Sequence, residues 1–471
     1  MIDTILISLG FIISVYMMIV IINYAAMLLI AYFTLRKNTG IDRQVETLPY
    51  QITKVMKPIS IVVPAYNESA GILNSIYSLL NLNYTQTEII IVNDGSTDDT
   101  QEKVLKEFKL IPVFEAIRVQ IPSKKIKQVY QSTVHTNLFF IEKENGGKSD
   151  ALNAGINLAH YPYICSIDGD SILHRDALFS IMTPISASNG QIIAAGGTIR
   201  VANEMNVELG DFKEPKIYSK PLILIQVIEY VRSFLIGRIS LSQFNLLLII
   251  SGAFSIFERQ WVIDVGGYST DMIGEDMELV VKLHRLIKER GVDKKIISIP
   301  DPICYTEAPN KLAILRRQRR RWHQGLLSSL LRHKDMLLNP KYGAIGMISL
   351  PYYWFVEAMG PVIEFLGVFY VILTFFFGQV YFEFIIMLSA FFLIYGGIYT
   401  IGALLLDSYT INGYVSTRAL FRMVIISMTE VFWYRPLNIF WRLEGIYQTL
   451  KGNTEWGEME RSGFSRKGDA E

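Results

Sequence analysis

The chain has 471 residues, of which 51% are hydrophobic and 19% are charged, with 45 Lys and Arg against 44 Asp and Glu. This apolar share excludes a mainly disordered chain, because disorder requires low hydrophobicity and high net charge. The formal net charge of +1 argues against a general nucleic-acid-binding protein, which carries a basic excess. The two cysteines, Cys165 and Cys304, are too few for a disulfide scaffold or a zinc cluster.

The first apolar segment lies at the N-terminus, where residues 4–35 contain no charged side chain. About 20 apolar residues span a bilayer as a helix, whereas the apolar core of a signal peptide has only about 7–15. We therefore predict a transmembrane helix over residues 1–36. Arg36 and Lys37 follow it directly, and positive charges stay on the cytoplasmic side. The N-terminus is therefore expected outside the cell, with the following residues in the cytosol.

A second apolar block covers residues 343–450. Within it, residues 365–406 contain one charged side chain, Glu383, and are long enough for two membrane crossings with a turn near residues 378–379. Glu357 and Glu364 come just before, and we expect both to face protein because acidic groups are costly in lipid. The block is therefore predicted to contain transmembrane or interfacial helices.

The end of this block is less regular. Arg435-Pro436 interrupts an apolar run, which predicts either a short hairpin or an interfacial helix. Residues 451–471 are expected to form a cytoplasmic tail, which requires an even number of crossings after the soluble block. The sequence leaves two or four crossings open.

The soluble block spans about residues 45–340 and repeats the pattern of apolar strand, polar loop and helix. This repeat predicts an α/β domain with a parallel, Rossmann-like sheet covered on both faces. In such sheets, ligands bind at the carboxyl ends of the strands. The expected strands cover residues 59–63, 88–93, 138–141 and 163–167.

Polar side chains follow these strands and are expected on one rim of the sheet. They are Tyr66, Glu68, Asp94, Lys148, Asp168 and Asp170. Asp168-Gly-Asp170 places two carboxylates on a tight turn, and hard oxygen ligands suit Mg²⁺ or Mn²⁺ together with substrate phosphates. The rim therefore predicts a site for a nucleoside diphosphate, with a metal at the diphosphate and a lysine nearby.

Four motifs in order give a more specific indication: Asp94, Asp168-Gly-Asp170, Gly274-Glu-Asp276 and Gln318-Arg-Arg-Arg-Trp322. Together they resemble the family-2 inverting glycosyltransferases. Within these, the chain is similar to the processive membrane synthases of cellulose, poly-N-acetylglucosamine, chitin and hyaluronan. The resemblance implies a cytosolic GT-A domain joined to an α-helical transmembrane region in the plasma membrane. It also implies a UDP-sugar donor, Mg²⁺ or Mn²⁺ as cofactor, and a glycan acceptor.

The resemblance also assigns roles to single residues. Asp276, with Glu275 beside it, matches the catalytic base, and Asp170 matches the metal ligand. The donor and its UDP would contact Tyr66, Glu68, Asp94, Lys148, Asp168, Gln318 and Arg321. The acceptor would contact Trp322, together with Ser251, Gly252 and Phe254 of a loop rich in small residues.

Two segments of the soluble block are expected to be interfacial helices, at about residues 221–250 and 310–335. For residues 221–250, a buried core helix is the alternative. The segment between Lys109 and Asn137 has no counterpart in the resemblance.

Three functions remain open at this point. The first is a processive synthase that extends a β-linked polysaccharide and passes it across the membrane. The second is an enzyme that adds a single sugar to a lipid acceptor, and the third, which the presence of Asp276 disfavours, is a protein that only binds. Family frequency favours UDP-glucose or UDP-N-acetylglucosamine as the donor, and leaves linkage and accessory subunits undetermined.

Overall fold

The computed structural model describes residues 2–45, 56–169, 171–203, 207–208, 211–212, 220–376, 382–410 and 417–452. The chain forms two compact units. The first consists of Met1–Ile41, Pro215–Leu246 and Pro309–Glu455, and the second of Asp42–Glu214, Leu247–Ala308 and Trp456–Glu471. The two expected interfacial segments therefore belong, over most of their length, to the first unit and not to the α/β block.

The second unit is built on a ten-stranded sheet with the order β3-β4-β5-β2-β1-β6-β11-β8-β12-β7. Its centre is parallel, since β1 pairs in parallel with β2 and β6, and β2 with β5. These strands are β1 (Ile59–Ala65), β2 (Thr87–Asn93), β5 (Leu138–Lys143) and β6 (Tyr163–Ile167). All four coincide with the predicted strands, because each is a short apolar run buried on both faces.

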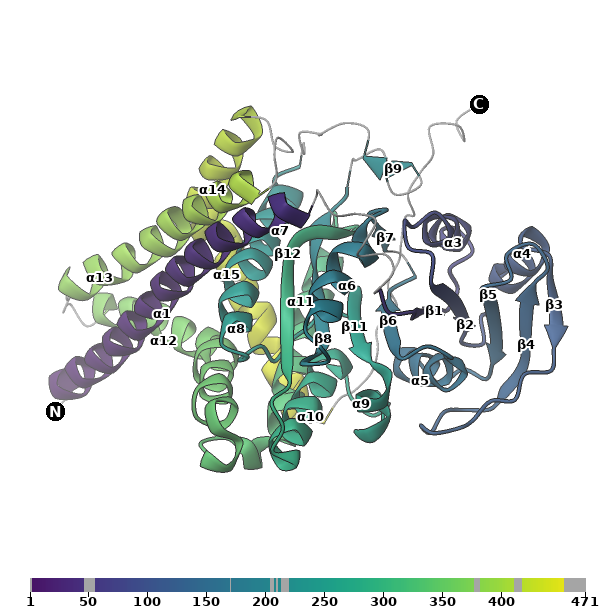
Figure 1. Cartoon of the computed structure of the whole chain (residues 1–471). Helices are drawn as coiled ribbons and strands as arrows, with labels where there is room; N and C mark the ends of the chain where they lie inside the picture. Colours follow the sequence, from purple (N-terminus) through teal and green to yellow (C-terminus); the bar gives the residue numbers. More distant parts are fainter. Residues whose placement is uncertain are drawn as a thin grey trace. The chain divides into compact units, whose positions relative to one another are not determined.

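Helices cover both faces of this parallel centre. Figure 1 shows α3 (Ile72–Leu80) and α5 (Lys148–Leu158) on opposite sides of β1 and β2. Gly155 lets α5 approach closely, because a Cβ at this position would overlap Val62 of β1 and lie 3.1 Å from Val92 of β2. The strand–helix repeat therefore produces the doubly covered sheet that the sequence predicts.

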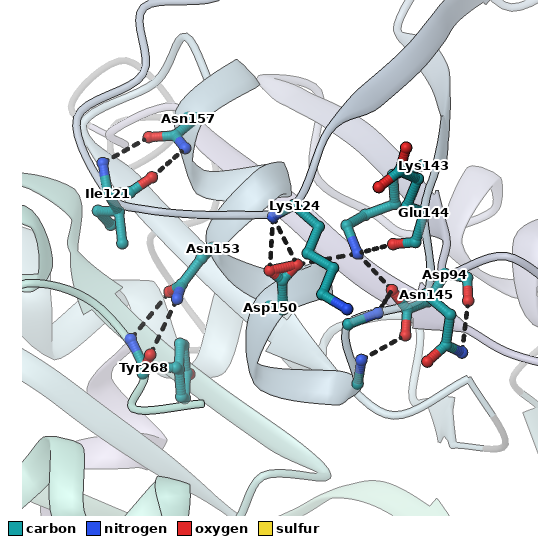
Figure 2. A network of polar contacts seen from close by, with 12 residues as sticks. Asp94, Ile121, Lys124, Lys143, Glu144, Asn145, Asp150, Asn153, Asn157 and Tyr268 are labelled. Carbon is teal, nitrogen blue, oxygen red and sulfur yellow. Dashed lines mark hydrogen bonds and ion pairs between the residues drawn. The ribbon is translucent and has the colours of Figure 1, made fainter. Parts of the chain in front are cut away.

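The segment without a counterpart adds to the edge of the sheet. It contains β3 (Leu110–Val113) and β4 (Ile126–Ser132), which pair antiparallel with each other, while β4 pairs antiparallel with β5. The sequence prediction missed both strands, because most of their residues are at least partly exposed and they lack the continuous buried apolar run of the central strands. The connection between them, residues 114–125, runs towards α5 (Figure 2).

The other elements of the second unit complete the sheet and its cover. β11 (Phe254–Glu258) lies antiparallel between β6 and β8 (Ile192–Val201), and β8 pairs in parallel with β12 (Lys295–Thr306). The remaining elements are α4 (Thr100–Glu107), β7 (Ile172–Leu173), α6 (Ala177–Ala187), β9 (Val207–Glu208), β10 (Asp211–Phe212), α9 (Arg259–Asp264) and α10 (Glu275–Arg290).

The first unit is helical and begins with α1 (Ile2–Val45). In the described part of the chain, Leu6–Lys37 is the one helix long and apolar enough to cross a membrane, and a second span is counted if a bent helix pair forms one crossing. That pair joins Ile345–Ala358 to Gly360–Phe376 at 41°. The predicted N-terminal apolar helix is present, whereas the multi-helix membrane region stays a prediction.

Helices α7 (Pro221–Val231), η1 (Arg232–Arg238) and α8 (Ile239–Gln243) correspond to the segment predicted at residues 221–250. Their buried side chains pack with α1 and with a later helix, α14 (Thr400–Thr410). The cluster contains Met27, Ala31, Leu35, Val231, Leu235, Ile236, Ile239, Tyr399, Ala403 and Leu406. The core-helix alternative therefore describes this packing better than an amphipathic surface helix does.

The C-terminal helices follow α11 (Leu312–Arg332) and short turns at η2 (Lys334–Met336) and η3 (Pro340–Tyr342). They are η4 (Ile345–Ser349), η5 (Tyr352–Ala358), α12 (Gly360–Phe376), α13 (Phe382–Leu393), η6 (Ile394–Tyr399), α14 (Thr400–Thr410) and α15 (Thr417–Leu450). The turn expected near residues 378–379 lies outside the described residues, between the end of α12 and the start of α13.

The break predicted at Arg435-Pro436 is wrong, because α15 continues through Pro436. A proline inside a helix removes one hydrogen bond and costs about 3 kcal/mol, which tertiary contacts can offset. Here Arg435 forms two hydrogen bonds with Glu364 of α12, at 3.1 and 2.8 Å. Glu357 is held by Tyr352, whose hydroxyl donates at 2.6 Å. The prediction that both acidic residues face protein is confirmed.

Candidate active site

The site at the carboxyl ends of the central strands is organised around Lys148, the first residue of α5. Its ammonium Nζ lies 2.7 Å from Asp168 Oδ1, 3.6 Å from Glu275 Oε1 and 4.0 Å from Asp276 Oδ2. Carboxylates from two segments distant in sequence, Asp168 and the adjacent pair Glu275 and Asp276, therefore gather around one cation. Burial disfavours the charge on Lys148, but the carboxylates of Asp168, Asp276 and Glu275 outweigh it and raise the pKa of the ammonium well above its usual range.

Glu275 and Asp276 form the first turn of α10. Acidic side chains are favourable there because the helix dipole places partial positive charge at the N-terminus. Glu275 is buried, whereas 29% of the Asp276 side chain is exposed, so the Asp276 carboxylate is the more accessible of the two. This difference favours Asp276 as the group that can meet a substrate.

The loop predicted to contact the acceptor lies against Asp276. A Cβ built on Gly252 would overlap the Asp276 carboxylate, so the backbone at Gly252 directly adjoins the predicted base. Ser251 precedes it, and the Ser251 carbonyl accepts a hydrogen bond of 3.3 Å from the Phe254 N–H. Phe254 itself is fully buried in β11, where it is paired with Ile167. The loop backbone, and not the Phe254 side chain, therefore adjoins the carboxylate.

The loops after β1 and β2 are joined to each other. Asn67 has a left-handed backbone (φ 54°), and its side-chain oxygen accepts a hydrogen bond of 2.8 Å from the Thr97 N–H. Tyr66 beside it is half exposed, while Glu68 is placed next to the Asp168 turn, since a Cβ at Gly169 would lie 3.7 Å from Glu68 Cγ. Tyr66 and Glu68 thus lie on loops at the predicted rim.

Asp94 is buried, and its carboxylate accepts hydrogen bonds from within the protein (Figure 2). The Gly146 N–H donates at 3.0 Å, the Gly147 N–H donates at 2.7 Å, and the Lys143 ammonium forms an ion pair with the same carboxylate. Asp94 therefore fixes the turn that leads into Lys148. A direct contact with uridine stays a prediction.

Lys143 and Asp150 are parts of this network that the sequence prediction missed. The Lys143 side chain is fully buried, and its ammonium lies 2.9 Å from Asp150 Oδ1 as well as beside Asp94. The sequence gives no local signal for this burial, because β5 ends in two charged residues, Glu142 and Lys143, as an exposed strand end does. The network ties the end of β2 to the start of α5.

The predicted metal ligand Asp170 lies outside the described residues. Among the residues that are described, no group of three or more His, Cys, Asp or Glu is arranged to hold a metal ion. The Asp168 side chain is 30% exposed at the end of β6, and Mg²⁺ commonly takes only one or two protein carboxylates plus substrate phosphates. Among the described residues, Asp168 is thus the carboxylate at this rim that is open to a metal completed by the nucleotide, and the metal site stays a prediction.

Gln318, Arg321 and Trp322 lie on α11, in the first unit. Trp322 is 44% exposed, and the Arg319 guanidinium lies 4.4 Å from the centroid of its ring. Arg319 also pairs with Glu229 of α7 at 2.5 Å. An exposed indole supported by a neighbouring cation can stack on a sugar ring, but the roles of these three residues at the diphosphate and acceptor stay predictions.

Comparison with known families gives two overlapping matches. The family model described as "Glycosyl transferase family 2" matches residues 60–266, and that described as "Glycosyl transferase family group 2" matches residues 226–405. Together they cover the strands of the candidate site, α10 and much of the helical unit.

Individual relatives point the same way. The chain is 33% identical over 276 residues to a poly-beta-1,6-N-acetyl-D-glucosamine synthase of Staphylococcus epidermidis, which covers 58% of this chain and 56% of the relative. A synthase of the same name from Staphylococcus aureus (strain COL) is 33% identical over 280 residues, covering 59% of this chain and 56% of the relative. The chain thus matches a little over half the length of these curated relatives.

One solved structure supports the fold. The mannosyltransferase PcManGT from Pyrobaculum calidifontis, in complex with GDP-Man and Mn²⁺, superposes with a TM-score of 0.51 at 15% identity. The match covers 95% of this chain and 100% of the mannosyltransferase chain. This likeness supports the GT-A fold predicted for the α/β unit.

Proposed function

The chain belongs to glycosyl transferase family 2, and from this premise we propose that it transfers N-acetylglucosamine from UDP-N-acetylglucosamine to a growing β-linked polysaccharide. The observation that carries the proposal is the convergence of Asp168, Glu275 and Asp276 on the Lys148 ammonium, with the Gly252 backbone beside Asp276. This cluster offers a cation for a diphosphate and a carboxylate for an attacking hydroxyl within one site.

The reaction is a direct displacement at the anomeric carbon. The acceptor hydroxyl attacks that carbon, its oxygen forms the new glycosidic bond, and the bond from the carbon to the UDP oxygen breaks. Asp276 accepts the hydroxyl proton as the bond forms, because a base within hydrogen-bond reach lowers the barrier to attack. Attack from the face opposite UDP inverts the configuration and gives a β-linkage from an α-linked donor.

The departing UDP gains negative charge, which the site must stabilise. Lys148 supplies one cation, and Asp94 with Lys143 keeps the preceding turn in place. When bound, Mg²⁺ or Mn²⁺ at Asp168 and Asp170 would neutralise charge on the diphosphate. Tyr66 and Glu68 are proposed to contact the nucleoside, and Gln318 and Arg321 the diphosphate.

The donor sugar is inferred from the relatives. Those named above are synthases of a poly-N-acetylglucosamine, which favours UDP-N-acetylglucosamine over UDP-glucose. Trp322 and the Ser251–Gly252 backbone are proposed to contact the acceptor end of the glycan.

The location is proposed on the N-terminal apolar helix. We propose that the enzyme is a multi-pass protein of the plasma membrane, with its N-terminus outside and the α/β domain in the cytosol, where nucleotide sugars are made. Helices of residues 343–450 would then adjoin the growing polymer and allow its passage across the membrane. Addition of one sugar to a lipid acceptor is the second candidate, since the same base and cation would serve it.

The test uses the full chain in membrane vesicles, with single UDP-sugars and Mn²⁺ or Mg²⁺. We expect UDP release and a long polymer with UDP-N-acetylglucosamine. The Asp276→Asn variant should retain UDP binding but lose turnover at least 10³-fold. A lipid bearing one sugar would select the second candidate, and absence of UDP release with every donor would exclude both.

A further inference from the structure

The polar face of α5 distinguishes it from an ordinary core helix. Every residue from Ser149 to Leu158 is buried, yet Asp150, Asn153 and Asn157 lie one or two turns apart on one face. Each of these three side chains bonds to backbone groups of a neighbouring loop (Figure 2). Buried polar groups of this kind need partners, so the loops are held in fixed positions relative to α5.

Asn153 holds the loop that leads to the predicted base. Its Nδ2 donates to the Tyr268 carbonyl at 2.9 Å, and the Tyr268 N–H donates back to its Oδ1 at 2.9 Å. The Asn153 side-chain amide thus pairs with the Tyr268 backbone through two hydrogen bonds, as the backbones of two residues on adjacent antiparallel strands do. Gly267 passes so close that a Cβ there would lie 2.5 Å from Asn153 Oδ1, and its φ of +72° also favours glycine.

The same loop is fastened to α10 at its other side. The Ser269 hydroxyl donates to Glu278 at 2.9 Å, and the Lys282 ammonium donates to the Gly267 carbonyl at 2.6 Å. Residues 267–269 thus connect two helices, α5 through Asn153 and α10 through Glu278 and Lys282.

These two helices begin at the candidate site. Lys148 starts α5, while Glu275 and Asp276 start α10, and the two ends meet in the ion pairs at 3.6 and 4.0 Å. Asn153 is five residues from Lys148, roughly 7.5 Å along the helix axis at 1.5 Å per residue. The loop of residues 267–269 is therefore fastened to both helices near the ends that carry Lys148 and Asp276.

We infer that Asn153 is a positioning residue for the transfer reaction: through the Tyr268 backbone, it sets the distance between the Lys148 cation and the Asp276 base. The catalytic roles of Lys148 and Asp276 rest on the proposed function. The attachment of residues 267–269 to α5 and α10 does not. Asn153 need not touch the substrate, so its loss should impair the chemical step more than donor binding.

Asn157 is the matched control. It accepts hydrogen bonds from the Gln120 and Ile121 N–H groups at 2.9 and 3.0 Å, and donates to the Ile121 carbonyl at 2.7 Å. It is the same residue type on the same buried face, with the same kind of backbone pairing. Its partner, however, is the connection between β3 and β4, and not the loop before α10.

The experiment compares Asn153→Ala and Asn157→Ala in the full chain. We expect both to lower the unfolding temperature, but only Asn153→Ala to lower kcat, at least 30-fold, with KM for the donor within threefold of wild type. Asn157→Ala should keep kcat within threefold. Equal kcat losses in both variants, or wild-type kcat in Asn153→Ala, would overturn the inference.

A second readout does not depend on activity. In hydrogen–deuterium exchange, Asn153→Ala should raise exchange in peptides covering residues 266–276, and Asn157→Ala in those covering 114–125. Unchanged exchange at 266–276 in Asn153→Ala would refute the fastening, even if the wild type releases no UDP and the proposed function fails. If Asn153→Ala does not fold, Ser269→Ala tests the loop from its α10 side. It should lower kcat about fivefold and raise exchange at 266–276, and the absence of both effects would overturn the inference.

Discussion

The backbone of Gly252 lies directly against the carboxylate of Asp276, so close that even a methyl group at residue 252 would overlap it. The contact joins a loop that precedes β11 to the first turn of α10, two segments separated by more than twenty residues. The Gly252 backbone therefore blocks one side of the Asp276 carboxylate. The proposed acceptor hydroxyl can therefore approach the base only from its remaining open side.

Replacing Gly252 with alanine should displace the Asp276 carboxylate or the loop. A misplacement of about 1 Å at a reacting group can reduce the rate about 10²-fold, so we expect Gly252→Ala to lose about that much UDP release. The control is Gly71→Ala, because a Cβ at Gly71 meets nothing within 4 Å and the residue has an ordinary φ of −122°. Wild-type turnover in Gly252→Ala would contradict the contact.

Removal of the Lys148 charge should separate the three carboxylates around it. Lys148→Met leaves Asp168, Glu275 and Asp276 without their common cation, and we expect a weaker affinity for UDP and a turnover lower by about 10²–10³-fold. Removing one partner of a fully buried ion pair costs about 3–5 kcal/mol of stability. The loss in Lys148→Met should be smaller, because 19% of the lysine side chain is exposed. Lys148→Arg, which keeps the charge, should retain more UDP affinity in calorimetry. Equal affinity in the two variants would argue against a charge effect.

The parts of the fold that depend on continuous local patterns could be predicted from the sequence. The four central strands are apolar runs that end in polar loops, and the order of those loops predicted Lys148 on the same rim as Asp168, whose carboxylate lies 2.7 Å from its ammonium. The order of the motifs along the chain also indicated the family, which neither the composition nor any one motif could do.

The remaining features depend on tertiary partners. The pairing of Lys143 with Asp94 joins residues 49 positions apart, and nothing local distinguishes Lys143 from an exposed lysine. No local pattern distinguishes Asn153 from other helix residues, because its partner is a backbone group of Tyr268, 115 residues away. The prediction at Pro436 failed for the same reason, since contacts from other helices maintain α15 where local propensity would end it.

Acidification should destabilise the α/β unit through His284. The side chain is fully buried on α10 and one ring nitrogen, Nε2, donates to the Leu247 carbonyl at 2.9 Å. Burial lowers the pKa of His284 to about 4, whereas an unfolded histidine has a pKa of about 6.5. Between these values the unfolded state binds the proton and the folded state does not. This contribution to the free energy of unfolding is therefore intact above pH 6.5 and decreases towards pH 4 by about 3 kcal/mol.

The measurement is the unfolding temperature of the purified chain between pH 4 and 7.5. His284→Gln retains an N–H donor but cannot titrate in this range, so its unfolding temperature should depend less steeply on pH. An identical pH dependence in the variant and the wild type would show that other groups determine the acid sensitivity.

The ion pair between Arg232 and Glu430 should be costly to break from one side. Its atoms lie 2.9 Å apart, and the two side chains are only 6% and 7% exposed, in the helical unit. Arg232→Met or Glu430→Gln alone leaves one charge buried without its partner, which we expect to cost about 3 kcal/mol or more. Combining Arg232→Met with Glu430→Gln removes both charges, so the double variant should be more stable than the sum of the single losses predicts. Thermal unfolding in detergent completes this double-mutant cycle, and additive losses would mean that the pair contributes no coupling energy.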